Sequence, residues 1–163
     1  MAELFKDFIL GIFGNLFGVF ILSMSPILEL RGSIPVGAVL GYEWWQVYLT
    51  AVLGNLVPVP FIVVFLRAVL DWLKKFGIFK KLAEKVEKIG NEKASRITKG
   101  IKIGIFLFVA IPLPGTGAWT GALISSMLNL KLKDCFVPIA LGVASAGTIM
   151  TVITYGVKIF AGF

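Results

Sequence analysis

Two side chains of opposite charge stand two positions apart in an otherwise apolar part of the chain. Glu29 and Arg31 lie within residues 25–42, SPILELRGSIPVGAVLGY, and apolar sequence flanks this segment on both sides. Ionisable residues at membrane depth are costly and are functional candidates by default. A carboxyl group there can carry a proton, and a guanidinium can hold an anionic substrate group. The alternative is a static salt bridge, because positions i and i+2 of an extended tip point to the same side.

A second irregular segment, AIPLPGTGAWTGALISS, carries no charge. Its glycines permit a tight turn, and the free N–H groups at the start of the following half-helix would attract an anion. Close helix packing explains the same glycines equally well. Asn55 is a membrane amide of the kind that more often joins helices than binds ligands. The predicted substrate site comprises Arg31, Gly32, Ser33, Asn55, Pro112, Pro114, Gly115, Thr116, Gly117 and Thr120, with Glu29 as the proton-coupling residue.

The composition excludes a soluble enzyme. Of 163 residues, 58% are hydrophobic and 15% are charged, and the mean hydropathy is +0.93. The absence of histidine removes Ser-His-Asp triads and histidine-based zinc sites. The single cysteine, Cys135, can form no internal disulfide. We therefore expect a membrane protein that is not an enzyme and that has neither a cofactor nor a metal centre.

All of the net charge lies in one central segment. Residues 67–102 hold eleven Lys/Arg and four Asp/Glu, a balance of +7 that equals the net charge of the whole chain. Apolar residues recur there every three or four positions, which predicts an amphipathic helix on a membrane surface. Its lysines suit anionic lipid headgroups, so nucleic acid is not an expected partner. The positive-inside rule places this segment in the cytoplasm and the protein in the inner membrane.

The hydropathy pattern predicts an all-α, multi-pass integral membrane protein with one domain over residues 1–163. The expected elements are a transmembrane helix at 8–24, a re-entrant hairpin at 25–43, a transmembrane helix at 44–66, the basic interfacial helix at 67–102, a second re-entrant hairpin at 103–130 and a transmembrane helix at 135–160. A cleaved signal peptide is the competing interpretation of the first run. The irregular backbone of 25–43 suggests a hairpin tip near residues 30–34.

The order of these elements predicts an inverted repeat. Sliding the sequence by 84 residues lays Gly37-Ala38 on Gly121-Ala122, and each half then consists of a broken hairpin followed by a long helix. Many secondary transporters are built from two such halves that meet near the membrane midplane. Gly14 and Gly18 have the GxxxG spacing of a helix-pairing seam, which makes a homodimer a candidate assembly.

Three motifs in this order resemble the small multidrug export protein family, which is grouped near the DedA-like (VTT-domain) membrane proteins. They are ELRGSIPVG, GNLVPVP and AIPLPGTGAWTGALISS, and the resemblance covers almost the whole chain. It implies two opposed re-entrant hairpins, with Glu29 and Arg31 matching the acidic and basic positions at hairpin tips. DedA-like relatives are implicated in moving polyprenyl-phosphate lipids and in proton-dependent drug tolerance. They usually place a further arginine in the second hairpin, where this chain has only Pro112–Gly117.

Three functions follow as hypotheses. The first is a proton-linked transporter or flippase for an amphiphile, with an anionic polyprenyl-phosphate-type lipid as the expected substrate. The second has the same fold but exports cationic drugs, which compete with protons for Glu29. The third is a non-transporting scaffold that binds partners through the basic helix. Membrane lipids and protons are partners in the first two cases.

Overall fold

The computed structural model describes residue 11 and residues 14–74, 94–113, 115–128 and 130–161. Every regular element in these ranges is an α-helix, so the predicted all-α class is confirmed. Two helical stretches, Trp44–Leu66 and Leu132–Val157, are long and apolar enough to cross a membrane. At 1.5 Å per residue they measure about 35 and 39 Å, against a hydrocarbon core of about 30 Å.

The first half of the chain forms a short helical hairpin and then a long, bent helix. Its elements are α2 (Leu16–Met24), α3 (Glu29–Val39), α4 (Trp44–Leu56) and α5 (Pro58–Lys74). Neither α2 nor α3 is long enough to cross a bilayer alone, because 9 and 11 residues span only about 14 and 17 Å. Between α4 and α5 the chain stays helical through Val57, so the prolines that follow bend the span without ending it.

The first hairpin differs from its predicted form in two respects. The chain reverses at residues 25–28, so the tip expected near residues 30–34 lies inside α3. The apolar run 8–24 is also not one continuous helix. Asn15 has an extended backbone, and its side-chain oxygen accepts a hydrogen bond from the Gly18 N–H at 2.9 Å, which starts α2 at Leu16. The Asn15 cap therefore starts a new helix inside the apolar run, which the hydropathy pattern alone did not indicate.

The second half has the order helix, break and helix, followed by a long helix. Its elements are α7 (Ala94–Ala110), α8 (Ala118–Met127) and α9 (Leu132–Ala161). The break between α7 and α8 coincides with the predicted Pro- and Gly-rich segment. Most of the amphipathic helix expected at 67–102 lies outside the described residues. Its first residues continue α5, and its last residues belong to α7.

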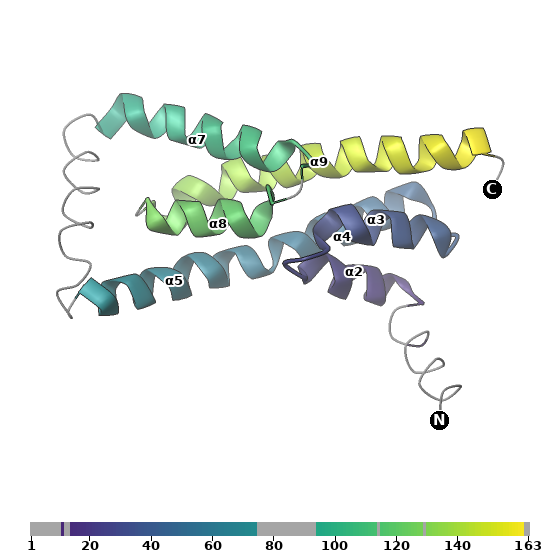
Figure 1. The fold of residues 1–163 in the computed structure, drawn as a ribbon, viewed down its shortest axis with the longest axis horizontal. Coiled ribbons are helices and arrows are strands. Elements are labelled where there is room, and N and C mark those ends of the chain that lie inside the picture. The colour runs from purple at the N-terminus through teal and green to yellow at the C-terminus, as the bar shows by residue number, and fades with distance from the viewer. Residues whose placement is uncertain (1–10, 12–13, 75–93, 114, 129, 162–163) are drawn as a thin grey trace.

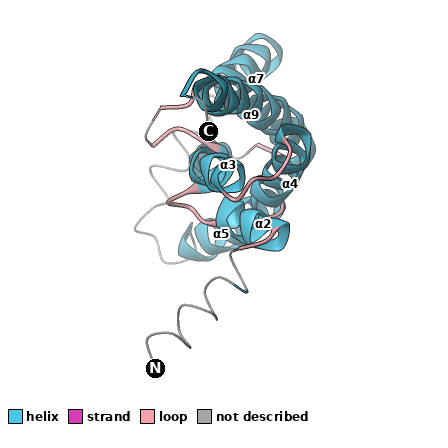
Figure 2. Cartoon of the chain, turned by 90° about the vertical axis from the view of Figure 1, so that its right-hand side faces the viewer, coloured by secondary structure: helices cyan, strands magenta, loops and turns pink. Residues whose placement is uncertain are grey.

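Helix α9 runs along most of the molecule and contacts both groups of short helices (Figure 1). Helices α7 and α8 lie beside the first part of α9, and α3 and α4 lie beside its second part. Helix α5 packs against α8 from the other side. The view along the long axis shows α2, α3 and α4 as neighbours at one end of the molecule (Figure 2). The turn of the first hairpin and the α7–α8 break thus approach each other near the middle.

Small residues bring the helices close together. A Cβ on Gly54 would lie 2.5 Å from the backbone oxygen of Phe20, and a Cβ on Gly142 would lie 2.7 Å from the Cβ of Val109. The core between the helices is built from aliphatic side chains, among them Val19, Ile34, Val47, Val63, Val109, Ile139 and Val143. Many large hydrophobic side chains instead point outward, as expected of a surface that faces lipid.

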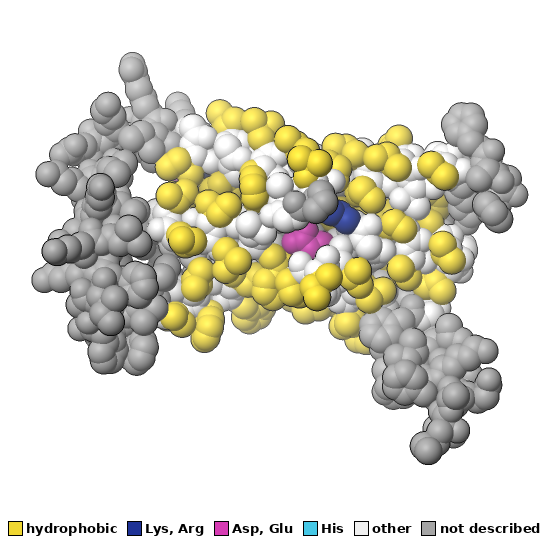
Figure 3. Space-filling model, in the orientation of Figure 1, with side chains coloured by type: hydrophobic (Ala, Val, Ile, Leu, Met, Phe, Trp, Pro, Cys, Tyr) yellow, Lys and Arg dark blue, Asp and Glu magenta, His cyan; other side chains and the backbone are white. Residues whose placement is uncertain are grey.

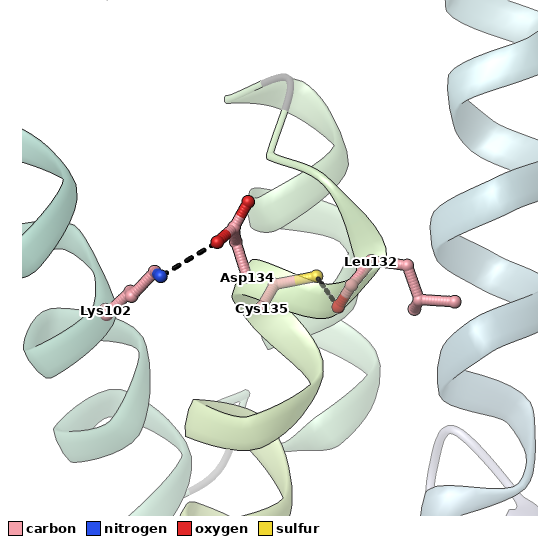
Figure 4. A network of polar contacts seen from close by, with 4 residues as sticks. All are labelled: Lys102, Leu132, Asp134 and Cys135. Carbon is pink, nitrogen blue, oxygen red and sulfur yellow. Dashed lines mark hydrogen bonds and ion pairs between the residues drawn. The ribbon is translucent and has the colours of Figure 1, made fainter. Parts of the chain in front are cut away.

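One ion pair joins α7 to α9 near the start of α9. Lys102 Nζ lies 2.8 Å from the Asp134 carboxylate, while the neighbouring Cys135 thiol lies 3.5 Å from the Leu132 carbonyl (Figure 4). Both charged side chains are about one-third exposed, so this pair orients α7 against α9 but adds little stability.

The contact between α2 and α4 gives a first prediction. Gly54→Ala places a methyl group against the Phe20 carbonyl, which cannot move without shifting α2. We expect the variant to lose about 1–3 kcal/mol of stability, measured as a lower melting temperature in detergent. Gly104→Ala is the matched control, because nothing lies within 4 Å of a Cβ at that position in α7. Equal melting temperatures for the two variants would contradict this packing.

Candidate functional site at the meeting of two helix breaks

The carboxylate of Glu29 lies at the N-terminal end of α8. The side chain is buried, with 6% of its surface exposed, and its Oε1 accepts a hydrogen bond from the Trp119 backbone N–H at 3.3 Å. A helix N-terminus carries unpaired N–H groups and the positive end of the helix dipole, so it stabilises a negative charge. Glu29 therefore supplies from α3 the cap that α8 lacks in its own sequence.

Arg31 performs the complementary role at the end of α7. Its guanidinium donates hydrogen bonds to the carbonyls of Ile111 and Leu113 and to Thr116 Oγ1, the last at 2.9 Å. Carbonyl groups at a helix C-terminus are unpaired and carry the negative end of the dipole, which favours a cation there. The planar fork of arginine can reach several acceptors at once, which a lysine ammonium cannot do in the same geometry.

Thr116 and Gly115 fold the break itself. The Thr116 hydroxyl lies 2.8 Å from the carbonyl oxygens of both Ile111 and Leu113, and it also accepts from the Leu113 N–H at 3.3 Å. Gly115 has a φ of +81°, in the left-handed region that glycine adopts without steric penalty. The break is thus a compact turn held by one threonine, one glycine and Arg31.

The static salt bridge between Glu29 and Arg31, which the sequence left open as an alternative, is not formed. In the described part of the chain no ion pair within 4.0 Å joins them, and each side chain turns to a different helix end. The reason is that residues 29–31 form the first turn of α3 rather than an extended tip, so positions i and i+2 do not face each other.

Glu29 also has a strained backbone. Its φ is +48°, which makes it the one non-glycine residue with positive φ among the residues that the structure describes. Such a conformation costs on the order of 1 kcal/mol or more and is maintained only when the surroundings enforce it. Here the tight turn from α2 and the cap on α8 together hold Glu29 in place.

An open cavity of about 430 Å³ lies where the two segments meet, and we call it the central cavity. Figure 3 shows an acidic and a basic side chain next to each other near the middle of one face, with hydrophobic side chains around them. Seven of the predicted site residues line the cavity, namely Glu29, Arg31, Gly32, Pro112, Gly115, Thr116 and Thr120. The cavity wall thus combines α3 and the turn before it with the α7–α8 break, α8 and, through Met150, α9.

Comparison with known proteins identifies the family. Residues 29–149, about three quarters of the chain, match the family model described as "Putative small multi-drug export protein". The chain belongs to this family. No curated protein and no solved structure matches it. The match begins at Glu29 and includes every part of the central cavity except Met150 of α9 and the turn that precedes α3.

The remaining predicted residues of this small multi-drug export family member lie elsewhere. Gly117 contacts the Glu29 carboxylate behind the cavity wall, and Pro114 is outside the described residues. Ser33 and Asn55 are buried in α3 and α4 and do not line the cavity. The Asn55 amide is buried without a hydrogen-bond partner among the described residues, so no such bond joins it to another helix there.

Sequence reasoning missed the turn residues 26–28 and Trp119. The turn forms one wall of the cavity, and the Ser25-Pro26 dipeptide was the available signal, because Ser-Pro favours turn initiation. The Trp119 indole N–H donates to the Met24 carbonyl at 3.0 Å and so fixes the end of α2 to α8. The described residues hold no cluster of three or more His, Cys, Asp or Glu suited to a metal ion.

The contact between Gly117 and Glu29 gives a second prediction. A Cβ on Gly117 would overlap the Glu29 carboxylate, so Gly117→Ala should push this group off the end of α8. We expect a lower melting temperature in detergent. In a Glu29→Ala background the same substitution should have a clearly smaller effect, because the overlapping group is gone. Additive effects of the two substitutions would show that the alanine acts through some other contact.

Proposed function

We propose that this protein is a membrane transporter that moves an amphiphilic substrate through the central cavity. The observation that carries the proposal is a pair of opposite charges, Glu29 and Arg31, in one cavity with otherwise mostly apolar surroundings. Membrane helices hold ionisable groups at depth at considerable cost, and such groups mark substrate or ion pathways. The family description and the two membrane-length helices agree with a transport role.

The substrate we propose carries an anionic headgroup of the polyprenyl-phosphate type. In the structure Arg31 bonds to neutral acceptors, a carbonyl and a hydroxyl. A phosphate is a much stronger acceptor than a carbonyl, because the bond is then between two ions. An entering phosphate would therefore draw the guanidinium away from the α7–α8 break. The apolar walls leave room for the first part of a lipid chain.

Proton linkage is the second part of the proposal. Ionised Glu29 occupies the N-terminal end of α8, where a substrate anion would otherwise bind. Protonation removes the attraction between the carboxyl group and the helix dipole, so Glu29 can leave and an anion can replace it. Proton binding and anion binding thus favour each other. Glu29 acts in this scheme as an internal competitor of the substrate.

The proposed architecture is an inverted repeat in the inner membrane. The group α2, α3 and α4 and the group α7 and α8 lie toward opposite ends of the molecule, and their short helices meet near the middle (Figure 1). Each group then forms a re-entrant hairpin from one side of the bilayer. The basic segment that links α5 to α7 faces the cytoplasm.

Export of cationic compounds is the second candidate function, favoured by the family description. It uses the same cavity, but the substrate cation would pair with Glu29 and be repelled by Arg31. The two candidates therefore differ in the sign of charge that the central cavity selects.

A third prediction tests whether the central cavity prefers an anionic substrate. Purified protein in detergent should bind a polyprenyl phosphate saturably and bind the uncharged polyprenol far more weakly. Arg31→Gln keeps a donor for the break carbonyls but removes the charge, and we expect it to weaken phosphate binding about 10- to 100-fold. Lys131→Ala, which removes an exposed cation at the start of α9, is the control and should bind normally. If Arg31→Gln binds as wild type does, the anionic-headgroup proposal fails.

A fourth prediction tests the proton linkage. Affinity for the polyprenyl phosphate should rise as the pH falls, because protonated Glu29 no longer occupies the end of α8. Glu29→Gln mimics the neutral side chain, so it should bind tightly and lose most of this pH dependence. The titration of the phosphate itself is removed by parallel measurements with a sulfate ester, which stays a monoanion over the whole pH range. An unchanged pH dependence in Glu29→Gln would overturn the role given to Glu29.

A further inference from the structure

A second cavity of about 430 Å³ lies between α4 and α9, apart from the central cavity. Its lining consists of Trp44, Tyr48, Thr148, Thr151, Val152 and Tyr155, and it shares no residue with the central cavity. We call it the aromatic cavity. We propose that the aromatic cavity binds the charged centre of a lipophilic organic cation, such as a quaternary ammonium or phosphonium compound.

The two tyrosine side chains of the aromatic cavity are held in place before any ligand arrives. The Tyr48 hydroxyl donates to the Ala144 carbonyl at 3.2 Å, and the Tyr155 hydroxyl donates to the Tyr42 carbonyl at 2.8 Å. A Cβ on Gly147 would lie 3.1 Å from the Tyr48 ring, so a glycine there lets the ring pack closely against α9. Rings fixed in this way lose little conformational entropy on binding.

The electrostatics of the aromatic cavity favour a cation. The faces of tryptophan and tyrosine rings are electron-rich and attract positive charge, most strongly where water is excluded. The residue before Trp44 is Glu43, whose carboxylate caps α4 and lies close enough to Tyr155 to act on it electrostatically. No lysine or arginine is among the described residues that line the cavity. An anion would find no partner there.

The wall of the aromatic cavity also contains a buried polar group without a partner, the hydroxyl of Thr151. Its side chain is 7% exposed, and its hydroxyl has no hydrogen-bond partner. The nearby Thr148 shows the usual alternative, because its hydroxyl bonds to the Ala144 carbonyl one turn earlier at 3.0 Å. The Thr151 oxygen is itself buried, so it would act on a cation through its dipole rather than by direct contact.

The test uses two probes of the same shape and opposite charge. Tetraphenylphosphonium should bind saturably to the purified protein, and tetraphenylborate should not compete for its site. Trp44→Leu should weaken tetraphenylphosphonium binding about three- to tenfold, and Trp44→Phe should restore most of it. Trp45→Leu is the matched control, because Trp45 is equally exposed, at 50% against 55%, but does not line the cavity.

Other outcomes would overturn the proposal. Equal losses in Trp44→Leu and Trp45→Leu would indicate simple partitioning at an aromatic membrane interface. Equal effects on the two probes would indicate a purely apolar groove. Loss of phosphonium binding in Glu29→Gln, with normal binding in Trp44→Leu, would place the cation in the central cavity. If Trp44→Leu does not fold, Tyr155→Leu takes its place with the same expectation.

This proposal does not depend on the function proposed above. Arg31→Gln should leave phosphonium binding unchanged, and Trp44→Leu should leave polyprenyl-phosphate binding unchanged. Each site can therefore fail its own test while the other passes.

Discussion

A helix that breaks in apolar surroundings must find partners for the N–H and carbonyl groups it exposes, and this requirement organises the structure. The break between α7 and α8 creates one negative and one positive helix end where water is scarce. Arg31 satisfies the first end, and Glu29 satisfies the second. Both come from the first turn of α3, so one segment completes the distant half of the chain. The tight turn before α3, the strain at Glu29 and the glycine at position 117 all serve this contact.

The same contact determines what the central cavity can bind. Its charged groups already have partners, because Glu29 caps α8 and Arg31 bonds to the α7–α8 break, where Thr116 contacts the same carbonyls. In the function we propose, a substrate would bind by exchange, and its net affinity would be the difference between the new contacts and those it replaces. This arrangement keeps two ions stable in an apolar environment while no ligand is present. Direct pairing of the two side chains would instead leave the N-terminal end of α8 without its cap.

The sequence alone predicted those features that depend on local pattern. These include the all-helical class, the Pro- and Gly-rich break, and the proximity of Glu29, Arg31 and Thr116, which line one cavity. The position of the first hairpin turn was not predicted, because an apolar run has no signal strong enough to show where a short helix stops. The partners of Glu29 and Arg31 were also inaccessible, because they lie 80 or more residues away and depend on how the halves pack. Asn55 attracted attention as a polar residue in a membrane helix, but its surroundings are decided by the packing of α4.

Helix α9 forms part of the wall of both cavities through consecutive residues. Met150 lines the central cavity, and Thr151 lines the aromatic cavity. Successive side chains on an α-helix point about 100° apart, so these two cavities lie on adjacent sides of the same helical turn. A rotation of α9 about its own axis would therefore reshape both walls in one movement. Movements of α9 therefore couple the two cavities, whereas substitutions in their other walls act on one cavity alone.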